Sequence, residues 1–291
     1  MLKLNRFTDA AQFYARAESF WMRHEAAHCL SIGITVGQIH NLNQYSAQPT
    51  YMALVEDEAG EIVLTALRTP PRDIILSLTD HPEALDLVAR DAHQEYGTLP
   101  GVQSVIAVSQ QFAERWTALT GAPARLEMPE RIYQISQVRP PVGVPGMLRR
   151  ANSGDRQRFV AWMKAFEAEA FGAAVTPLDR FETWFDSALD AQDRGTYLWE
   201  DAANGGCVSM ACNGGPTPNG MRIGPVYTPP EKRGRGYGSA ATAEVSRLLL
   251  ESGRKFCFLY TDLRNPTSNK IYQQIGYEPV IDCGLYRFDA G

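Results

Sequence analysis

Prolines and glycines interrupt the chain near its middle, and this interruption limits what the chain can fold into. Residues 138–146, VRPPVGVPG, hold three prolines and two glycines. Proline lacks the backbone N–H that a helix interior or a central strand needs, so neither can run through this stretch. We therefore expect a Pro/Gly linker at residues 139–146, between an N-terminal domain at 1–138 and a C-terminal domain at 147–291.

Both sides of the linker predict strands and helices in a comparable order. Before it, we expect helices at 8–30, 81–97 and 110–121, and strands at 50–70 (a hairpin), 73–79, 102–109 and 131–138. After it, we expect helices at 155–172, 177–192, 239–253 and 266–276, and strands at 146–151, 195–201, 206–213, 221–228, 255–262 and 277–288, the last closing the sheet. This order predicts an α/β (α+β) protein with a mixed central sheet flanked by helices, in two weakly related halves.

Composition excludes several classes of function. The net charge is −5, which argues against a nucleic-acid partner. The five cysteines are odd in number and form no C-x-x-C pair, as expected for reduced thiols in the cytoplasm. No apolar run is long enough for a membrane span or a signal peptide, so we expect a cytoplasmic protein without a membrane partner.

The sequence HEAAH, from His24 to His28, matches the H-E-x-x-H signature of zinc metallopeptidases. Such a site needs a third ligand. In the extended signature Ser31 stands where glycine is required, and Ile34 stands where the third histidine is required. We therefore expect no metal site, and we treat a zinc peptidase as a remote alternative.

A glycine-rich stretch in the C-terminal half predicts a phosphate-binding loop. A strand runs into Pro229 and Pro230, followed by RGRGYG from Arg233 to Gly238 and then a helix. Glycines allow close approach of the backbone to a ligand, and the first amides of a helix are unpaired and favour anions. Lys232, Arg233 and Arg235 add positive charge. A Walker A loop is absent, and the match to G-x-G-x-x-G lacks a well-placed acidic partner.

Two motifs together resemble the GNAT acyltransferase superfamily. Arg233, Gly236 and Gly238 fill its motif A, R/Q-x-x-G-x-G/A. Downstream, an asparagine is followed seven residues later by a tyrosine and then by Gly-Tyr, as in motif B; these residues are Asn265, Tyr272, Gly276 and Tyr277. The resemblance covers residues 146–291 and implies a GNAT fold. The two-domain layout is similar to glycine N-acyltransferase-like proteins, with a degenerate GNAT-like N-terminal domain that lacks the glycine loop and binds no CoA.

The resemblance implies roles for individual residues. The strand at 221–228 would be bulged at Gly224-Pro225 and splay from its neighbour to admit the pantetheine arm of acyl-CoA. Val226 would bind the thioester carbonyl through its amide, and Tyr272 would protonate the leaving thiolate; we assign these two to catalysis. The residues implied to bind the cofactor are Val226, Tyr227, Thr228, Arg233, Gly234, Arg235, Gly236, Tyr237, Gly238, Ser239, Asn265, Ser268 and Tyr272.

The implied function is an acyl-CoA-dependent N-acyltransferase that uses acetyl-CoA or another acyl-CoA and no metal. It would transfer the acyl group directly to an amine of a small molecule or peptide. The general base stays open among Glu167, Glu169, Glu200, Asp201 and a water chain. The alternative is a non-catalytic acyl-CoA-binding or sensor protein on the same fold. The acceptor, the acyl chain length and the oligomeric state, including a homodimer, are left open.

Overall fold

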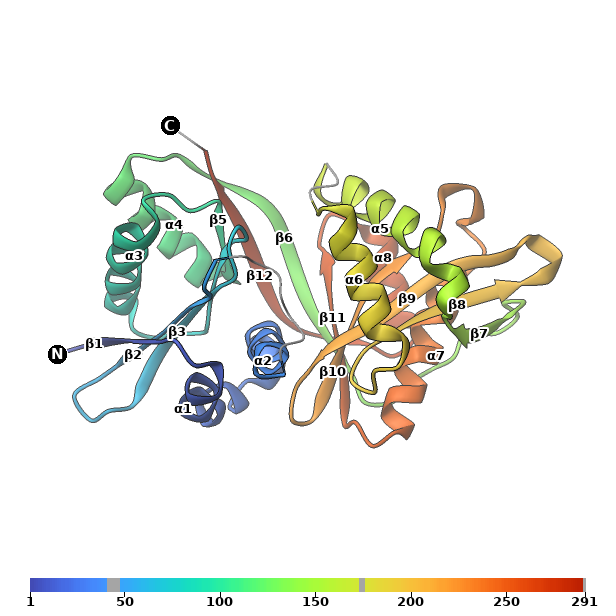
Figure 1. The fold of residues 1–291 in the computed structure, drawn as a ribbon, viewed down its shortest axis with the longest axis horizontal. Helices are drawn as coiled ribbons and strands as arrows, with labels where there is room; N and C mark the ends of the chain where they lie inside the picture. The colour runs from blue at the N-terminus through green and yellow to red at the C-terminus, as the bar shows by residue number, and fades with distance from the viewer. Residues whose placement is uncertain (41–47, 173–175, 290–291) are drawn as a thin grey trace. The chain divides into compact units, whose positions relative to one another are not determined.

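The computed structural model describes residues 1–40, 48–172 and 176–289, and Figure 1 shows its helices and strands. The elements before the Pro/Gly stretch are β1 (Lys3–Phe7), α1 (Ala10–Met22), α2 (Glu25–Ile39), β2 (Tyr51–Glu56), β3 (Ile62–Arg68), β4 (Ile74–Leu76), α3 (Pro82–Tyr96), β5 (Gly101–Val105), α4 (Ile106–Thr120) and β6 (Ala124–Ile135). Among the described residues, no helix is long and apolar enough to span a bilayer.

The elements after this stretch alternate in a similar way. They are β7 (Met147–Arg150), α5 (Arg156–Phe171), α6 (Leu178–Leu189), β8 (Gly195–Asp201), β9 (Gly206–Pro216), β10 (Gly220–Tyr227), α7 (Tyr237–Glu251), β11 (Phe256–Asp262), α8 (Pro266–Gln274) and β12 (Glu278–Phe288). The predicted mixture of helices and strands is therefore confirmed.

Two local predictions are wrong in their boundaries. The expected helix at 8–30 is two helices, which break at Arg23 and His24, and the second continues to Ile39. The expected strand at 102–109 ends at Val105, and helix α4 begins at Ile106. Periodicity cannot separate a short apolar strand from a buried helix turn, so the run VIAV was ambiguous.

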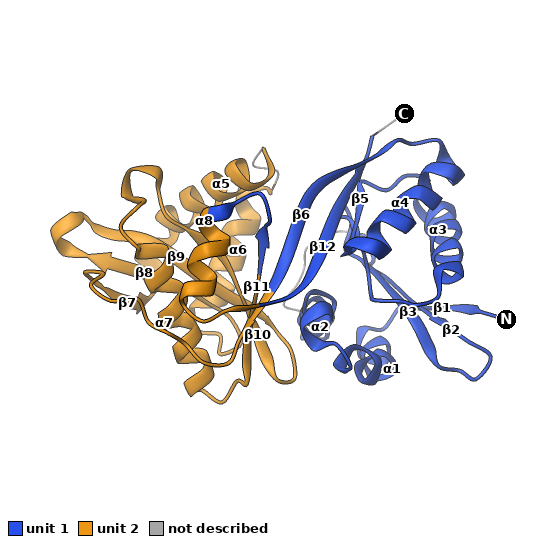
Figure 2. Ribbon diagram, turned by 180° about the vertical axis from the view of Figure 1, so that it is seen from behind, with its two compact units in different colours: residues 1–132, 260–266, 279–291 blue, residues 133–259, 267–278 orange. Residues whose placement is uncertain are grey.

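The chain forms two compact units that interleave along the sequence (Figure 2). Unit 1 consists of Met1–Ile132, Tyr260–Pro266 and Pro279–Gly291, and unit 2 consists of Tyr133–Leu259 and Thr267–Glu278. Strands β6 and β11 each begin in one unit and end in the other. The stretch expected to be a linker lies in unit 2, where Trp199 Nε1 donates a hydrogen bond to the Pro145 carbonyl at 2.8 Å.

Unit 1 contains a mixed sheet in the order β1-β2-β3-β4-β5-β12-β6. The pairs from β1 to β4 are antiparallel, whereas β4 and β5 are parallel. The last strand was expected to close the sheet of the C-terminal half, and this expectation is wrong. β12 pairs antiparallel with β5, with Cys283 opposite Val105 and Arg287 opposite Gly101. It pairs with the edge of β5 that β4 leaves open. An unpaired sheet edge exposes backbone N–H and C=O groups that can pair with another chain.

Unit 2 contains the strand order β11-β10-β9-β8-β7, with helices on both faces. The neighbours from β7 to β10 are antiparallel, and β10 and β11 are parallel. On one face, Phe159 of α5 and Phe185 of α6 pack with Met210 of β9. On the other face, Val245 of α7 and Tyr272 of α8 belong to a second apolar cluster. This arrangement positions the candidate site between the end of β10 and the start of α7.

Candidate functional site

Strand β10 parts from β11 after only three paired residues. The parallel register runs from Gly220–Phe256 to Arg222–Phe258, and no later pair is formed between these strands in the described residues. The partner on the other side, β9, shifts register between Ile223 and Val226. Gly224 has φ 144°, which favours glycine, and the Gly224–Pro225 peptide bond is cis. The expected bulge and splay at Gly224-Pro225 are confirmed.

The glycine-rich loop turns the chain directly into helix α7. Gly234 and Gly236 have φ values of 76° and 81°, in the left-handed region, and Gly236 caps the helix. The first helical hydrogen bond runs from Ala240 N to Gly236 O at 2.9 Å. The amides of residues 237–239 precede this bond and have no acceptor within the helix. Unpaired amides at a helix N-terminus are suited to an anion.

Helix α7 starts very close to the end of β10. A Cβ atom added at Gly238 would lie 3.2 Å from Thr228 Oγ1, tighter than most such contacts. A Cβ atom at Gly236 would lie 2.9 Å from Val144 Cγ2, a contact that forces a shift. Thr228 Oγ1 also lies 2.8 Å from Ser209 Oγ on β9. The structure thus brings Thr228 close to Gly238 of the glycine loop.

Two of the three loop cations contact a neutral residue. Lys232 Nζ donates to the Asn204 carbonyl at 2.6 Å, and Arg235 donates to Asn204 Oδ1 at 2.5 Å. These contacts hold the cations without neutralising their charge. Arg233 instead donates to the Glu169 carboxylate at 2.6 Å. The sequence did not predict that Asn204 would hold these cations. Its place before the Gly205-Gly206 turn was the only feature that marked it.

The ring of Tyr237 points into the core, so only its backbone amide remains for a cofactor. Its side chain is about 1% exposed and its hydroxyl donates to Asp201 Oδ2 at 2.7 Å. This hydrogen bond holds the pKa of Asp201 below its usual range. Asp201 also accepts hydrogen bonds from Ala203 N and Asn204 Nδ2. Asp201 therefore acts as an anchor for the turn that holds Lys232 and Arg235.

Tyr272 lies on α8, in the same apolar cluster as Val226 and Tyr237. Its ring centroid is 6.0 Å from that of Tyr277. Burial raises the pKa of Tyr272 to about 12, so the phenol is protonated near neutral pH. Ser268 is on the same helix, which begins directly after Asn265.

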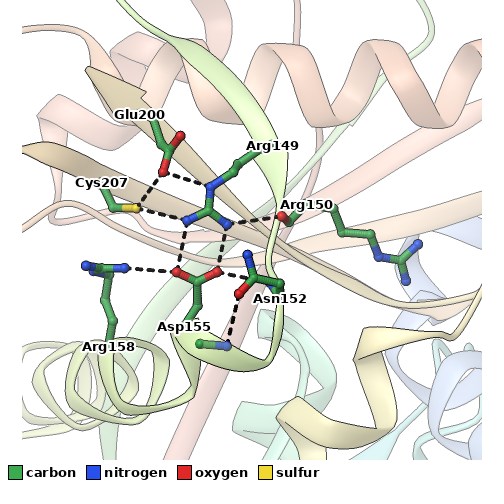
Figure 3. Close-up of polar contacts among 8 residues, drawn as sticks. Arg149, Arg150, Asn152, Asp155, Arg158, Glu200 and Cys207 are labelled. Atoms are coloured by element: carbon green, nitrogen blue, oxygen red, sulfur yellow. Dashed lines mark hydrogen bonds and ion pairs between the residues drawn. The ribbon is translucent and has the colours of Figure 1, made fainter. Parts of the chain in front are cut away.

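The four carboxylates considered as bases have different surroundings. Glu167 accepts hydrogen bonds from Thr176 through both N and Oγ1, at 3.0 and 2.5 Å. Glu200 pairs with Arg149 at 2.8 Å and accepts a hydrogen bond from Cys207, in the charged network of Figure 3. Glu169 differs from Glu167 and Glu200 because its carboxylate accepts hydrogen bonds from two predicted site residues, Tyr227 and Arg233.

The two histidines of HEAAH lie close together, with ring centroids 6.4 Å apart, but only His28 is inside the helix. His24 caps α2, and His28 is buried within it. His28 Nδ1 lies 3.0 Å from the Trp21 carbonyl, and Leu78 N donates to Nε2 at 3.2 Å, so both ring nitrogens are engaged. Burial lowers the pKa of His28 to about 4. Within the described ranges, no group of three or more His, Cys, Asp or Glu residues is placed to hold a metal ion.

Comparison with known proteins agrees with this geometry. Residues 206–284 match the family model described as FR47-like protein. The fold is similar to a GCN5-related N-acetyltransferase from Sphaerobacter thermophilus, with 19% identity, coverage of 98% of this chain and 95% of that chain, and a TM-score of 0.64. The chain has the GNAT fold. The resemblance found in the two sequence motifs is confirmed.

Two further GNAT structures match along nearly the whole chain. An acetyltransferase of the GNAT family from Colwellia psychrerythraea is 11% identical, with coverage of 99% of this chain and 100% of that one and a TM-score of 0.58. A tandem GNAT protein from the clavulanic acid biosynthesis pathway is 13% identical, with coverage of 99% and 98% and a TM-score of 0.57. No curated protein matches the sequence.

Proposed function

We propose that this GNAT chain is an acyl-CoA-dependent N-acyltransferase, which uses acetyl-CoA and transfers the acyl group directly to an amine of a small molecule or peptide. One observation carries the proposal: β10 and β11 part after Arg222–Phe258, beside the glycine loop and the N-terminus of α7. A splayed strand can pair with an extended pantetheine arm. The adjacent helix N-terminus suits a diphosphate.

In this proposal, each group of site residues has a separate role. The amides of residues 234–239 bind the diphosphate, and Lys232 and Arg235 add charge from the Asn204 side. Thr228, Asn265 and Ser268 hold the pantetheine arm. The amide of Val226 stabilises the oxyanion that forms as the amine attacks the thioester. Tyr272 donates its proton to the departing thiolate.

Calorimetry with CoA tests the cofactor site directly. The wild-type protein should bind CoA, and Gly236→Asp should abolish binding, because it places a carboxylate against the diphosphate. Gly253→Asp is the matched control, since Gly253 also has a positive φ, 101°, but follows the far end of α7. Thermal melting of each variant separates loss of binding from loss of fold.

The outcomes are distinct. If the folded wild-type protein does not bind CoA, the proposal is wrong. Binding that survives in Gly236→Asp would place the cofactor elsewhere. Release of free CoA from acetyl-CoA in the presence of amines identifies an enzyme. Binding without acyl transfer to any amine of a broad panel would instead support the sensor alternative.

A further inference from the structure

Helix α5 presents an aromatic stripe that ends in a carboxylate at the candidate site. Trp162, Phe166 and Glu169 are spaced four and three residues apart, so they share one helix face. The ring centroid of Trp162 lies 6.2 Å from that of Tyr227 at the end of β10. Trp162 and Phe166 pack against the apolar cluster that contains Tyr227.

The Glu169 carboxylate is shared between two site residues. Its Oε1 accepts a hydrogen bond from the Tyr227 hydroxyl at 3.2 Å, and its Oε2 accepts one from Arg233 at 2.6 Å. Arg233 is the first residue of the glycine-loop motif and also donates from Nε to the Thr228 carbonyl at 2.9 Å. One guanidinium therefore links the phosphate-binding loop to the helix that carries the aromatic stripe.

The Arg233–Glu169 ion pair is exposed enough for a ligand to replace one of its partners. The side chains of Arg233 and Glu169 are 47% and 45% exposed. Exposed ion pairs contribute at most about 1 kcal/mol, so a diphosphate with two negative charges can compete for the guanidinium. Arginine also binds phosphate oxygens with favourable planar geometry.

We propose that Glu169 binds the acceptor amine in its protonated form, which releases a proton to solvent before the nitrogen attacks, and that CoA makes Glu169 available by engaging Arg233. In the free protein Arg233 neutralises Glu169. When the diphosphate takes over Arg233, the Glu169 carboxylate is left without its counter-ion, next to the Tyr227 hydroxyl. The acceptor amine then binds more tightly to the CoA complex than to the free protein, and linkage requires the amine to tighten CoA binding by the same factor.

The surroundings of Glu169 define the acceptor class. Trp162 and Phe166 are only partly buried and offer aromatic surface to an apolar body, and a cation close to such rings gains further attraction. A carboxylate beside the amine would face Glu169 and be repelled. The acceptor is therefore a primary amine on an aromatic or apolar body, without a neighbouring carboxylate.

This inference rests on the proposed CoA site, so CoA binding is measured first, by calorimetry, with no amine present. Glu169→Gln should bind CoA as tightly as wild type or severalfold more tightly, because Arg233 loses a competitor. Glu231→Gln is the matched control: it removes a negative charge from an exposed residue of the same loop, and Glu231 is not a partner of Arg233 in that ion pair. If Glu169 only held the loop in shape, Glu169→Gln would weaken CoA binding, and the inference would be overturned.

The second measurement uses 2-phenylethylamine as the probe, with phenylalanine as its carboxylate-bearing counterpart. We expect the wild-type protein saturated with CoA to bind 2-phenylethylamine about tenfold more tightly than the free protein does, a typical coupling between linked sites. Glu169→Gln should lose this difference, and Glu231→Gln should keep it. Phenylalanine should bind more weakly than 2-phenylethylamine.

Three results would contradict the inference while leaving the cofactor site intact. They are equal affinity for the amine with and without CoA, an undiminished effect of CoA in Glu169→Gln, and no binding of 2-phenylethylamine to the CoA complex. Failure of the wild-type protein to bind CoA is a different result, since it removes the proposed function itself.

Discussion

Burial raises the pKa of Tyr272 from 10 to about 12, so its hydroxyl stays protonated near neutral pH, as the proposed acid requires. We predict that Tyr272→Phe lowers kcat on the order of 10²-fold, the low end for general acid catalysis, since CoA thiolate is already a fair leaving group. KM for acetyl-CoA should stay nearly constant, because the lost interaction belongs to the transition state. Thiol release from acetyl-CoA measures both.

The neighbouring Tyr277 gives the control for this prediction. Its hydroxyl bonds to Ser246 Oγ at 2.9 Å inside the same cluster. Tyr277→Phe should therefore reduce stability and leave kcat nearly unchanged. A wild-type rate in Tyr272→Phe, with chemistry shown to be rate-limiting, would make Tyr272 a core residue only.

His28 makes stability depend on pH. Burial is the main cause that lowers its pKa from 6.5 to about 4 in the folded chain, helped by the charges of His24 and Arg23. Between these values the unfolded chain takes up a proton that the folded chain does not. We predict that the free energy of unfolding falls by up to roughly 3 kcal/mol from this group as the pH drops from 7 to 4. Urea titrations at several pH values measure this loss.

The contribution of His28 is isolated by substitution. His28→Gln should be less stable at pH 7, because it loses a bond to Trp21 or Leu78, and should show a shallower fall between pH 6.5 and 4. His40→Gln, at the exposed end of α2, should keep the wild-type slope. Equal slopes in the wild type and in His28→Gln would show that this histidine titrates normally in the folded chain.

At the scale of elements, a charged network holds β7 to the start of α5 (Figure 3). The Asp155 side chain is about 5% exposed, and its two oxygens bind Arg149 at 2.7 and 2.9 Å. It also accepts from Arg158 and from Asn152 N, which closes a capping box. The guanidinium of Arg149 holds the pKa of Asp155 below its usual range, so this stabilisation is complete at neutral pH and is lost only in acid.

We predict that Asp155→Ala lowers the free energy of unfolding by about 3 kcal/mol, because it removes a cap and leaves Arg149 without its main partner. Chemical denaturation at pH 7 measures the change. Arg156→Ala is the control: Arg156 pairs with Asp186 at the surface, where both side chains are more than 40% exposed, and should cost less than about 1 kcal/mol. Equal losses in the two variants would contradict the network's role.

Most helices and strands of unit 2 could be predicted from the sequence, because they depend on residues that are close together in the chain. The positive φ values at Gly234 and Gly236 and the break at Gly224-Pro225 follow from what each residue can adopt. The Glu169–Arg233 contact was not readable, since it joins residues on separate elements, α5 and the loop after β10. The inward orientation of the Tyr237 ring could not be predicted either, because it depends on a hydrogen bond to Asp201 of β8.

At the scale of the whole molecule, the interleaving of the units escaped prediction. Residues 277–288, YEPVIDCGLYRF, predict a strand equally well whichever strand they pair with. Their partner, β5, is set by which sheet edge remains open, and that is a property of the assembled fold. Pairing between strands distant in sequence carries no local signature.

We predict that ending the chain after Glu278 damages unit 1, although the deleted residues follow unit 2 in sequence. The truncation removes β12 from beside β5 and takes away the buried side chains of Cys283, Leu285 and Phe288. Limited proteolysis followed by mass spectrometry should show new cleavage within residues 1–132, with residues 147–259 still protected. Removal of residues 289–291 alone should leave the pattern unchanged, and a protected unit 1 in the longer truncation would contradict the assignment of β12.

The position of β12 also bears on how the chain folds as it leaves the ribosome. Domains usually fold as units in order of synthesis, the N-terminal one first. Here the N-terminal unit lacks one of its inner strands until residues 278–288 have emerged, by which time all of residues 133–259 have been made. The unit translated first is thus the one completed last, and in the interval the edge of β5 is open to pairing with a neighbouring nascent chain.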